Sequence, residues 1–114
     1  MKINSFEDIL AWKKAKDLTV AVYKTTKSNK DNGFNSQLQR AAVSIMNNIA
    51  EGFERQSNKE FKKFLYIAKG SCGEVRSMLR LGQSLETINE DSGKILIDQS
   101  IEISKLLSGL IKKL

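Results

Sequence analysis

The sequence predicts an all-α fold, an up-down-up-down antiparallel four-helix bundle in which residues 1–114 form one domain. Its 114 residues include no Pro and only seven Gly, which is a composition typical of helices. Apolar residues recur every three or four positions in four successive segments, the period of a helix with one buried face. Short connections join these segments, so consecutive helices are expected to be antiparallel neighbours.

The first predicted helix runs from Ile9 or Leu10 to about Ser28. Ser5 and Asp8 resemble a capping arrangement just ahead of it. Residues that recur on one side of this helix are expected to face the core: Ala11, Ala15, Leu18, Val22 and Thr25.

The second predicted helix runs from about Asn35 to Arg55, after a turn signal at Asp31-Asn32-Gly33. Its apolar residues cover more than half of its circumference: Leu38, Ala41, Ala42, Val43, Ile45, Met46, Ile49, Ala50, Gly52 and Phe53. A surface helix usually has a narrower apolar face. We therefore expect this helix to contact protein on more than one side, including a neighbouring subunit.

The third predicted helix runs from Asn58 to about Thr87. It starts at Ser57-Asn58-Lys59-Glu60, a capping box in which the Ser and Glu side chains satisfy free backbone amides. Its expected core face recurs with bundle spacing over its whole length: Phe61, Phe64, Leu65, Ala68, Cys72, Val75, Leu79 and Gly82.

The fourth predicted helix runs from about Lys94 to Leu114, after a polar connection from Ile88 to Gly93. Its core candidates are Ile97, Ile101, Leu107, Leu110, Ile111 and Leu114.

Two glycines, Gly70 and Gly73, lie in the interior of the third helix. Each costs about 1 kcal/mol relative to Ala. Close backbone approach to Ala41 and Ala42 on the second helix is the expected compensation. A phosphate-binding glycine loop does not fit, because it needs a preceding strand and free amides at a helix start.

Polar residues form a narrow stripe on the second helix, and an antiparallel turn would bring them level with the third helix. The predicted structural seam consists of Arg40, Ser44, Asn48, Glu51, Arg55 and Glu74. Arg40 is expected to meet Glu74, and Glu51 to meet Arg55 or Lys62. Arg40→Ala is therefore expected to weaken the fold or its assembly.

The alternative interpretation of this seam is catalytic, with Glu51 or Glu74 as an acid or base beside Arg40. The sequence contains no His, no Cys cluster and no nucleophile with a partner base. It also lacks metal-ligand spacing. We predict that the protein is not an enzyme and uses no cofactor or metal.

Basic residues exceed acidic ones by 19 to 13, a net charge of +6. Helix polarity places many of them at the end of the bundle where the first and third helices start. The candidate nucleic-acid-binding residues at this basic pole are Lys13, Lys14, Lys16, Arg55, Lys59, Lys62, Lys63, Lys112 and Lys113. Lysines in the first turns of a helix oppose its dipole, so a phosphate-binding role is one explanation. Ordinary solvated lysines are the other.

Compartment and aromatic residues add two expectations. The single Cys72 has no internal disulfide partner, and no apolar run suits a signal peptide or a membrane span. We expect a cytoplasmic protein without a membrane partner.

Tyr66, set among lysines of the third helix, is a candidate for stacking on a base.

The segments QLQRAAVSIMNNIAEGFER and EFKKFLYIAKGSCGEV carry a family resemblance. Its marks are Gln37, Arg40-Ala41-Ala42, Ser44-Ile45, Asn48-Ile49-Ala50-Glu51-Gly52, Arg55, Phe61, Phe64-Leu65, Ala68, Gly70-Ser71 and Glu74. With FEDILAWKKA and LLSGLIKKL at the two ends, the chain closely resembles the four-helix proteins encoded in intervening sequences of bacterial 23S ribosomal RNA genes. It departs from the Phe-Pro common in the family's first connection, since residues 28–35 contain no Pro.

The resemblance implies a left-handed four-helix bundle. Similar accessory proteins of diversity-generating retroelements form pentameric barrels and bind nucleic acid and a reverse transcriptase through basic surfaces. The leading hypothesis is therefore a non-enzymatic homo-oligomer, preferably a pentamer, that binds structured RNA, DNA or a nucleic-acid-containing complex. The alternative is a protein–protein scaffold or assembly module without nucleic-acid binding. An enzyme using Arg40, Glu51 and Glu74 is a third hypothesis.

Overall fold

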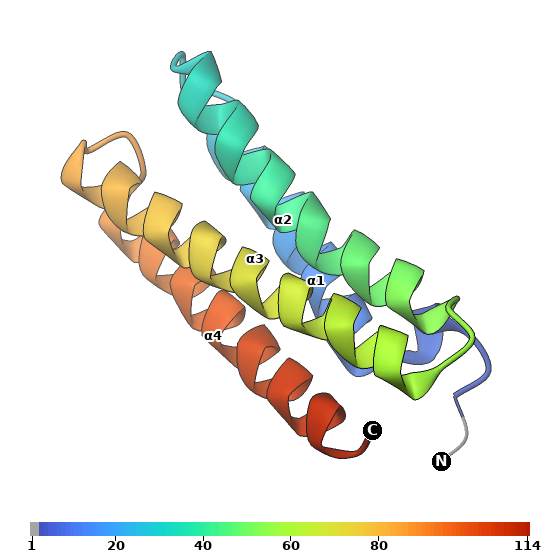
Figure 1. Ribbon diagram of the computed structural model, residues 1–114. Coiled ribbons are helices and arrows are strands. Elements are labelled where there is room, and N and C mark those ends of the chain that lie inside the picture. The colour runs from blue at the N-terminus through green and yellow to red at the C-terminus, as the bar shows by residue number, and fades with distance from the viewer. Residues whose placement is uncertain (1–2) are drawn as a thin grey trace.

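The computed structural model describes residues 3–114 and is an all-helical, four-helix bundle, as predicted (Figure 1). The first two residues of the predicted domain lie outside the described residues. A short 3₁₀ helix, η1, precedes the bundle. The elements are η1 Phe6–Asp8, α1 Leu10–Thr26, α2 Asn32–Phe53, α3 Asn58–Ser84 and α4 Glu90–Lys112.

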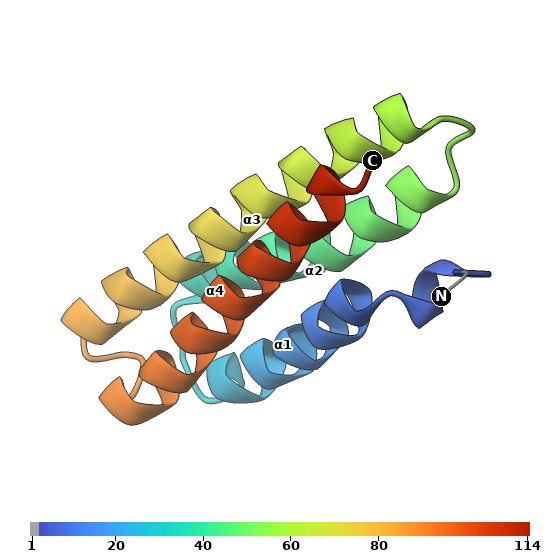
Figure 2. The same cartoon turned by 90° about the horizontal axis from the view of Figure 1, so that it is seen from below.

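Consecutive helices pack side by side and α4 closes the bundle against α1, while in the described chain the backbones of the two diagonal pairs stay more than 8 Å apart between Cα atoms. Figures 1 and 2 show that α1 and α3 start at the end where α2 and α4 finish. The molecule measures 43 × 21 × 19 Å, close to the length of its longest helix at 1.5 Å per residue. Among the described residues, none of the helices has the length and apolar character needed to span a bilayer.

The core consists of one continuous apolar cluster contributed by all four helices. Its largest fully buried apolar side chains are Leu18, Val22, Leu38, Ile45, Ile49, Leu65, Val75, Leu79, Ile103 and Leu107. Phe64, Ile101, Leu110 and Leu114, predicted in the core, are only half-buried. On α1 the expected Thr25 is half-buried, whereas Thr26 lies one turn after Val22 and is buried.

Two helices start earlier than predicted. α2 begins at Asn32 because the Asp31 carboxylate accepts a 3.1 Å hydrogen bond from the Phe34 amide. α4 begins at Glu90 because the Asn89 side chain accepts bonds of 2.9 and 3.2 Å from the amides two and three residues later. Asp and Asn are favoured both in turns and at helix N-caps. The segments that the sequence suggested were connections therefore form the first turns of α2 and α4.

The capping signals ahead of α1 and α3 have different outcomes. The Ser57 hydroxyl accepts a 3.1 Å bond from the Glu60 amide and caps α3, which confirms the Ser half of the predicted capping box. Among the described residues, the Glu60 carboxylate makes no return bond to the Ser57 amide. Ser5 and Asp8 instead cap η1, through a 3.3 Å bond from the Ser5 amide to the Asp8 carboxylate.

The C-terminus of α3 lies at Ser84, three residues before the predicted end. Glu86 follows with a φ of 61°, the left-handed conformation that closes many helices. The Thr87 amide then donates a 3.0 Å bond back to the Gly82 carbonyl. This reversal directs the chain into the short connection to α4.

The connection between α1 and α2, which contains no proline, is held by side-chain amides. Buried Asn35 donates through Nδ2 to the carbonyls of Asn29, at 2.7 Å, and Thr26, at 3.2 Å. Asn29 in turn donates to the Asn35 Oδ1 at 3.1 Å. These bonds satisfy the end of α1 and set its angle to α2.

Candidate nucleic-acid interface

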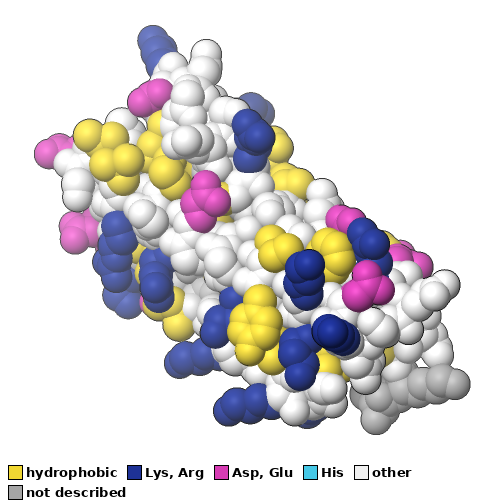
Figure 3. All heavy atoms as spheres, viewed as in Figure 1, with side chains coloured by type: hydrophobic (Ala, Val, Ile, Leu, Met, Phe, Trp, Pro, Cys, Tyr) yellow, Lys and Arg dark blue, Asp and Glu magenta, His cyan; other side chains and the backbone are white. Residues whose placement is uncertain are grey.

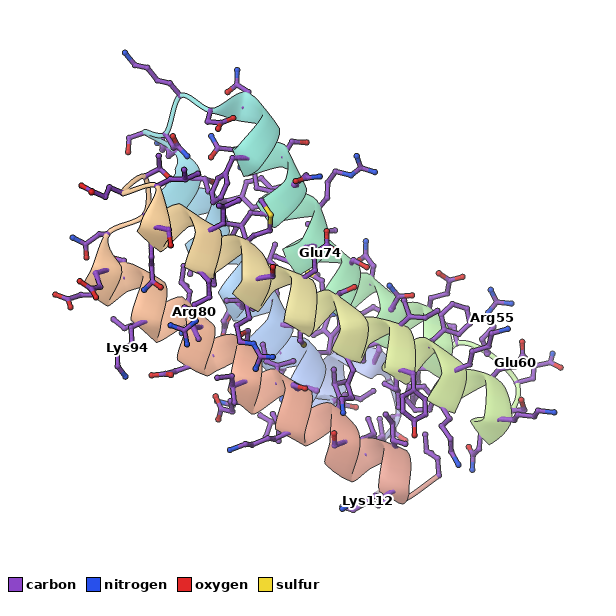
Figure 4. The ribbon with its side chains drawn as sticks, turned by 60° about the vertical axis from the view of Figure 1, so that its left-hand side comes forward. Arg55, Glu60, Glu74, Arg80, Lys94 and Lys112 are labelled. Carbon is purple, nitrogen blue, oxygen red and sulfur yellow. The ribbon has the colours of Figure 1, made fainter. Side chains whose placement is uncertain are left out.

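The structure brings the nine predicted cations to one end of the bundle, where α1 and α3 start and α2 and α4 end. They are Lys13, Lys14, Lys16, Arg55, Lys59, Lys62, Lys63, Lys112 and Lys113, the basic pole. All are exposed except Lys14 and Lys62, which are half-buried. Figure 4 shows Arg55 at the turn between α2 and α3, and Lys112 at the end of α4.

Two of the nine cations have carboxylate partners. The Lys14 ammonium lies 3.4 Å from Glu102, and the Arg55 guanidinium lies 2.8 Å from Glu51 and 3.9 Å from Glu60. Among the residues that the structure describes, the other seven have no carboxylate within ion-pair distance. Their charge is therefore available to an external anion.

Aromatic rings hold part of the pole in place. The Arg55 guanidinium lies 4.9 Å from the centre of the Phe64 ring, and the Lys16 ammonium lies 5.8 Å from the Trp12 ring. The Phe6 and Trp12 rings meet edge to face at 5.2 Å. Tyr66 is 58% exposed and makes no such contact with the residues that the structure describes, so its ring is accessible for stacking.

The middle of the predicted seam is a hydrogen-bonded polar cluster between α2 and α3. Asn48 Nδ2 donates to the carbonyl and the hydroxyl of Ser44 at 2.8 and 3.0 Å. The Ser71 hydroxyl donates to the Ser44 hydroxyl at 2.9 Å. Ser71 is thus a member of the seam that was not among its predicted residues.

The two outer contacts of the seam have different outcomes. Arg40 and Glu74 line one groove of about 360 Å³ with Gln37, Ala41 and Ser44, but both are exposed and the structure describes no ion pair between them. The predicted contact of Glu51 with Arg55 or Lys62 is confirmed for Arg55, at 2.8 Å. In water, the conformational entropy lost by fixing two long exposed side chains offsets most of the free energy gained from an ion pair between them. Glu51 and Arg55 are already neighbours on one face of α2, so their pair loses less entropy.

The same geometry separates the proposed catalytic trio. Glu51 does not line the groove that contains Arg40 and Glu74. Within the described residues no group of three His, Cys, Asp or Glu is placed to hold a metal ion.

The prediction that Gly70 and Gly73 pack against alanines is wrong. A Cβ built at either position would meet nothing within 4 Å, because the buried stripe of α3 passes through Ala68, Cys72 and Val75 and leaves these glycines to its sides. Gly52 makes the close approach instead. A Cβ there would lie 2.6 Å from the Phe64 Cβ and 3.0 Å from the Phe61 ring.

Cys72 is free and buried on α3. Burial raises the pKa of its thiol from 9.0 to about 12, against the opposing effect of the nearby Lys69 and Arg76 charges. The thiol is therefore neutral at ordinary pH and is a poor nucleophile.

Residues 7–109 match the profile of the 23S rRNA-intervening sequence protein family. The chain belongs to this family. Among curated proteins, no relative matches it.

A solved structure similar to this family member is a protein of unknown function from the S23 ribosomal protein family of Bacteroides thetaiotaomicron VPI-5482, determined at 1.70 Å resolution. The two chains are 29% identical, and the alignment covers 90% of this chain and 99% of the other, with a TM-score of 0.84. The helical bundle is thus shared with an experimentally determined relative.

The sequence analysis placed the candidate cations at one end, but the structure shows that others lie along α3 and α4. Figure 3 shows Lys and Arg side chains gathered along the edge where these helices lie. On α3, Lys69 and Arg76 line a groove shared with α4, and Arg80 lies one turn further along the helix. Their shared spacing of seven and four residues on one helix was the signal that could have identified them.

Proposed function

We propose that this member of the family is a non-enzymatic protein that binds structured RNA through the basic pole. The observation that carries the proposal is the set of seven pole cations that have no carboxylate partner in residues 3–114. A cation that is free of a partner can bind a phosphate without first breaking an ion pair. Each such contact also releases condensed counterions from the nucleic acid.

The start of α3 adds a second argument. Lys59, Lys62 and Lys63 all lie in its first two turns, where the positive end of the helix dipole disfavours cations. Their placement lowers the stability of the helix. Lys59 and Lys63 are exposed, so packing does not compensate for this loss. The family's description, which refers to 23S rRNA-intervening sequences, makes structured RNA the first probe to test.

The test is binding of a fluorescent RNA hairpin with single-stranded flanks across a salt series. Wild-type affinity is expected to fall as salt rises, with a slope of about −0.7 to −0.9 per phosphate contact. Lys59→Gln combined with Lys63→Gln should bind more weakly and with a shallower slope. The matched control, Lys27→Gln with Lys30→Gln, removes the same charge at the opposite end. No binding at low salt, or equal losses in both variants, would exclude the basic pole as the interface.

We further propose that the protein is a homo-oligomer, with a pentamer as the preferred state. Large apolar side chains that stay about half exposed support it, among them Leu10, Val20, Ile67, Leu85 and Ile95. α2 contributes no large apolar side chain of this exposure within the described chain, so the width of its apolar face no longer argues for a subunit contact there.

The second candidate function is an assembly module that self-associates but does not bind nucleic acid. Light scattering coupled to size exclusion separates the states. The pentamer predicts five times the chain mass of 12.8 kDa. A strict monomer at high concentration would remove both the pentamer and the self-assembly form of this candidate.

A further inference from the structure

We propose that the groove between α3 and α4 binds an unpaired strand of nucleic acid, with Lys69 and Arg76 on its phosphates and Tyr66 stacked on a base. This inference rests on the proposed RNA-binding function and assigns it a second, more specific surface. The α3 part of its lining begins at Lys69, in the middle of the helix, away from the turn between α2 and α3 where Figure 4 shows Arg55.

The groove has a volume of about 300 Å³, and its lining contains two cations and no carboxylate. It is lined by Lys69, Cys72, Gly73 and Arg76 of α3 and by Ser100, Ile101 and Ser104 of α4. Gly73 lies between the two cations, and a Cβ there would meet no atom within 4 Å. Small side chains on both helices therefore leave room beside the charges.

The floor of this groove carries no competing anion. The Cys72 thiol is buried and has a pKa of about 12, so it stays protonated at neutral pH. Ser100 directs its hydroxyl to the Ile97 carbonyl at 2.7 Å and is satisfied within its own helix. Neither group neutralises Lys69 or Arg76, and among the described residues neither cation has a carboxylate partner.

Positive charge continues along both rims of the groove. Positions separated by alternating four and three residues share one side of a helix. On α3 they are Lys62, Tyr66, Lys69, Gly73, Arg76 and Arg80, and on α4 they are Lys94, Asp98, Ile101, Lys105, Ser108 and Lys112. The α3 row spans roughly 27 Å at 1.5 Å per residue.

Asp98 is the one acid in these two rows, and it is 3.3 Å from Lys94. Figure 4 shows Arg80 between α3 and α4 with Lys94 beside it, whereas Glu74 lies on the opposite side of α3, toward α2. The one acid of the two rows, Asp98, therefore lies at the Lys94 end. The other charged residues of both rows are basic, and two of them, Lys69 and Arg76, line the groove itself.

Tyr66 decides between an unpaired strand and a duplex. It lies between Lys62 and Lys69 in the α3 row and is 58% exposed. An aromatic ring beside a cationic groove is the arrangement that binds single strands, since each unpaired base offers a face for stacking. In a duplex the bases are already stacked on one another, so only the phosphates could contact this surface.

The test uses a labelled oligouridine of about 12 nucleotides, within the site sizes of roughly 4–16 known for single-strand binders. Lys69→Gln with Arg76→Gln should weaken its binding roughly 20-fold at about 0.1 M salt and flatten the salt slope by about 1.4, because two phosphate contacts are lost. Lys27→Gln with Lys30→Gln is the charge-matched control and should bind nearly as the wild type does.

Tyr66→Leu tests the stacking contact and should weaken oligouridine binding by roughly fivefold or more. It should leave the affinity for a fully paired RNA duplex unchanged. Tyr23→Leu is its matched control, because Tyr23 is a similarly exposed tyrosine on α1.

Each outcome separates this inference from the function on which it rests. If the wild type binds RNA but the groove variant matches its charge control, the groove is not the site and the proposed function stands. If Tyr66→Leu weakens strand and duplex equally, the preference for an unpaired strand is wrong. If the wild type binds neither oligouridine nor the hairpin at low salt, both proposals fall.

Discussion

Glycines and polar residues have different roles on the two sides of α3: they pack tightly toward α2 and leave an open groove toward α4. Toward α2, Gly52 allows close packing against the phenylalanines of α3, and Ser44 and Ser71 are hydrogen-bonded at 2.9 Å. Toward α4, Gly73 opens onto free space and Lys69 lies in a groove without a carboxylate. A glycine or a charge on a helix therefore has no fixed meaning. What the neighbouring helix places opposite it decides whether it packs or stays available.

The largest expected effect tests whether the Cys72 side chain, at the floor of the α3–α4 groove, is protected from solvent. At pH 8 the Cys72 thiol should react with a disulfide reagent at least about tenfold more slowly in the folded protein than in urea. Burial raises its pKa from 9.0 to about 12 and so lowers the thiolate fraction, and the greater nucleophilicity of a more basic thiolate offsets only part of that loss. Absorbance of the released thiolate gives both rates. Comparable rates would mean that this side of α3 is not sealed at its floor.

Glycine replacement should have opposite signs on the two sides. Gly52→Ala forces a methyl group into the phenylalanines of α3 and should destabilise the protein by about 1–3 kcal/mol. Gly73→Ala meets open space and should stabilise α3 by up to about 1 kcal/mol. Urea unfolding of both variants measures the difference. Equal effects would remove the contrast between a packed and an open side.

The polar cluster gives a smaller effect on the α2 side. Ser44→Ala removes a hydroxyl that bonds to Ser71 and Asn48, and should lower the free energy of unfolding by about 1 kcal/mol. Ser104→Ala, on the α4 side of the groove, makes no hydrogen bond in the described chain through its side chain and should change stability by less than about 0.5 kcal/mol. A neutral Ser44→Ala would show that the seam is not structural.

Arg40→Ala should have the smallest effect. The sequence suggested that this change weakens the fold through a lost pair with Glu74, but Arg40 is exposed and has no ion pair among the described residues. The expected change in thermal unfolding is therefore within about 0.5 kcal/mol of zero. A large loss of stability would restore the ion pair as a structural element.

The features that the sequence predicted well depend on periodicity. The four helices and the central core positions, such as Leu18, Ile45, Leu65 and Leu107, follow from apolar spacing that no alternative element satisfies. The starts of α2 and α4 were missed because Asp31 and Asn89 serve equally in turns and caps. Local sequence alone does not distinguish these two roles.

The site features that were missed depend on helix rotation. Counting from the turn between α2 and α3 places Arg40 level with Glu74 along the axis, but it does not say which way either side chain faces. Gly70 and Gly73 were misassigned for the same reason. The α3–α4 groove requires the rotation of two helices at once, so its cations were not separated from ordinary surface lysines.

The central claim is that nucleic acid contacts the basic pole and the α3–α4 side while the α2–α3 side is structural. Amide chemical-shift mapping of the labelled protein with an RNA hairpin that carries an unpaired tail tests this claim directly. The account predicts shifts around Lys59, Lys69 and Arg76 and little change at Arg40, Ser44 or Lys27. Shifts confined to the α2–α3 groove, or no shifts at low salt, would contradict it.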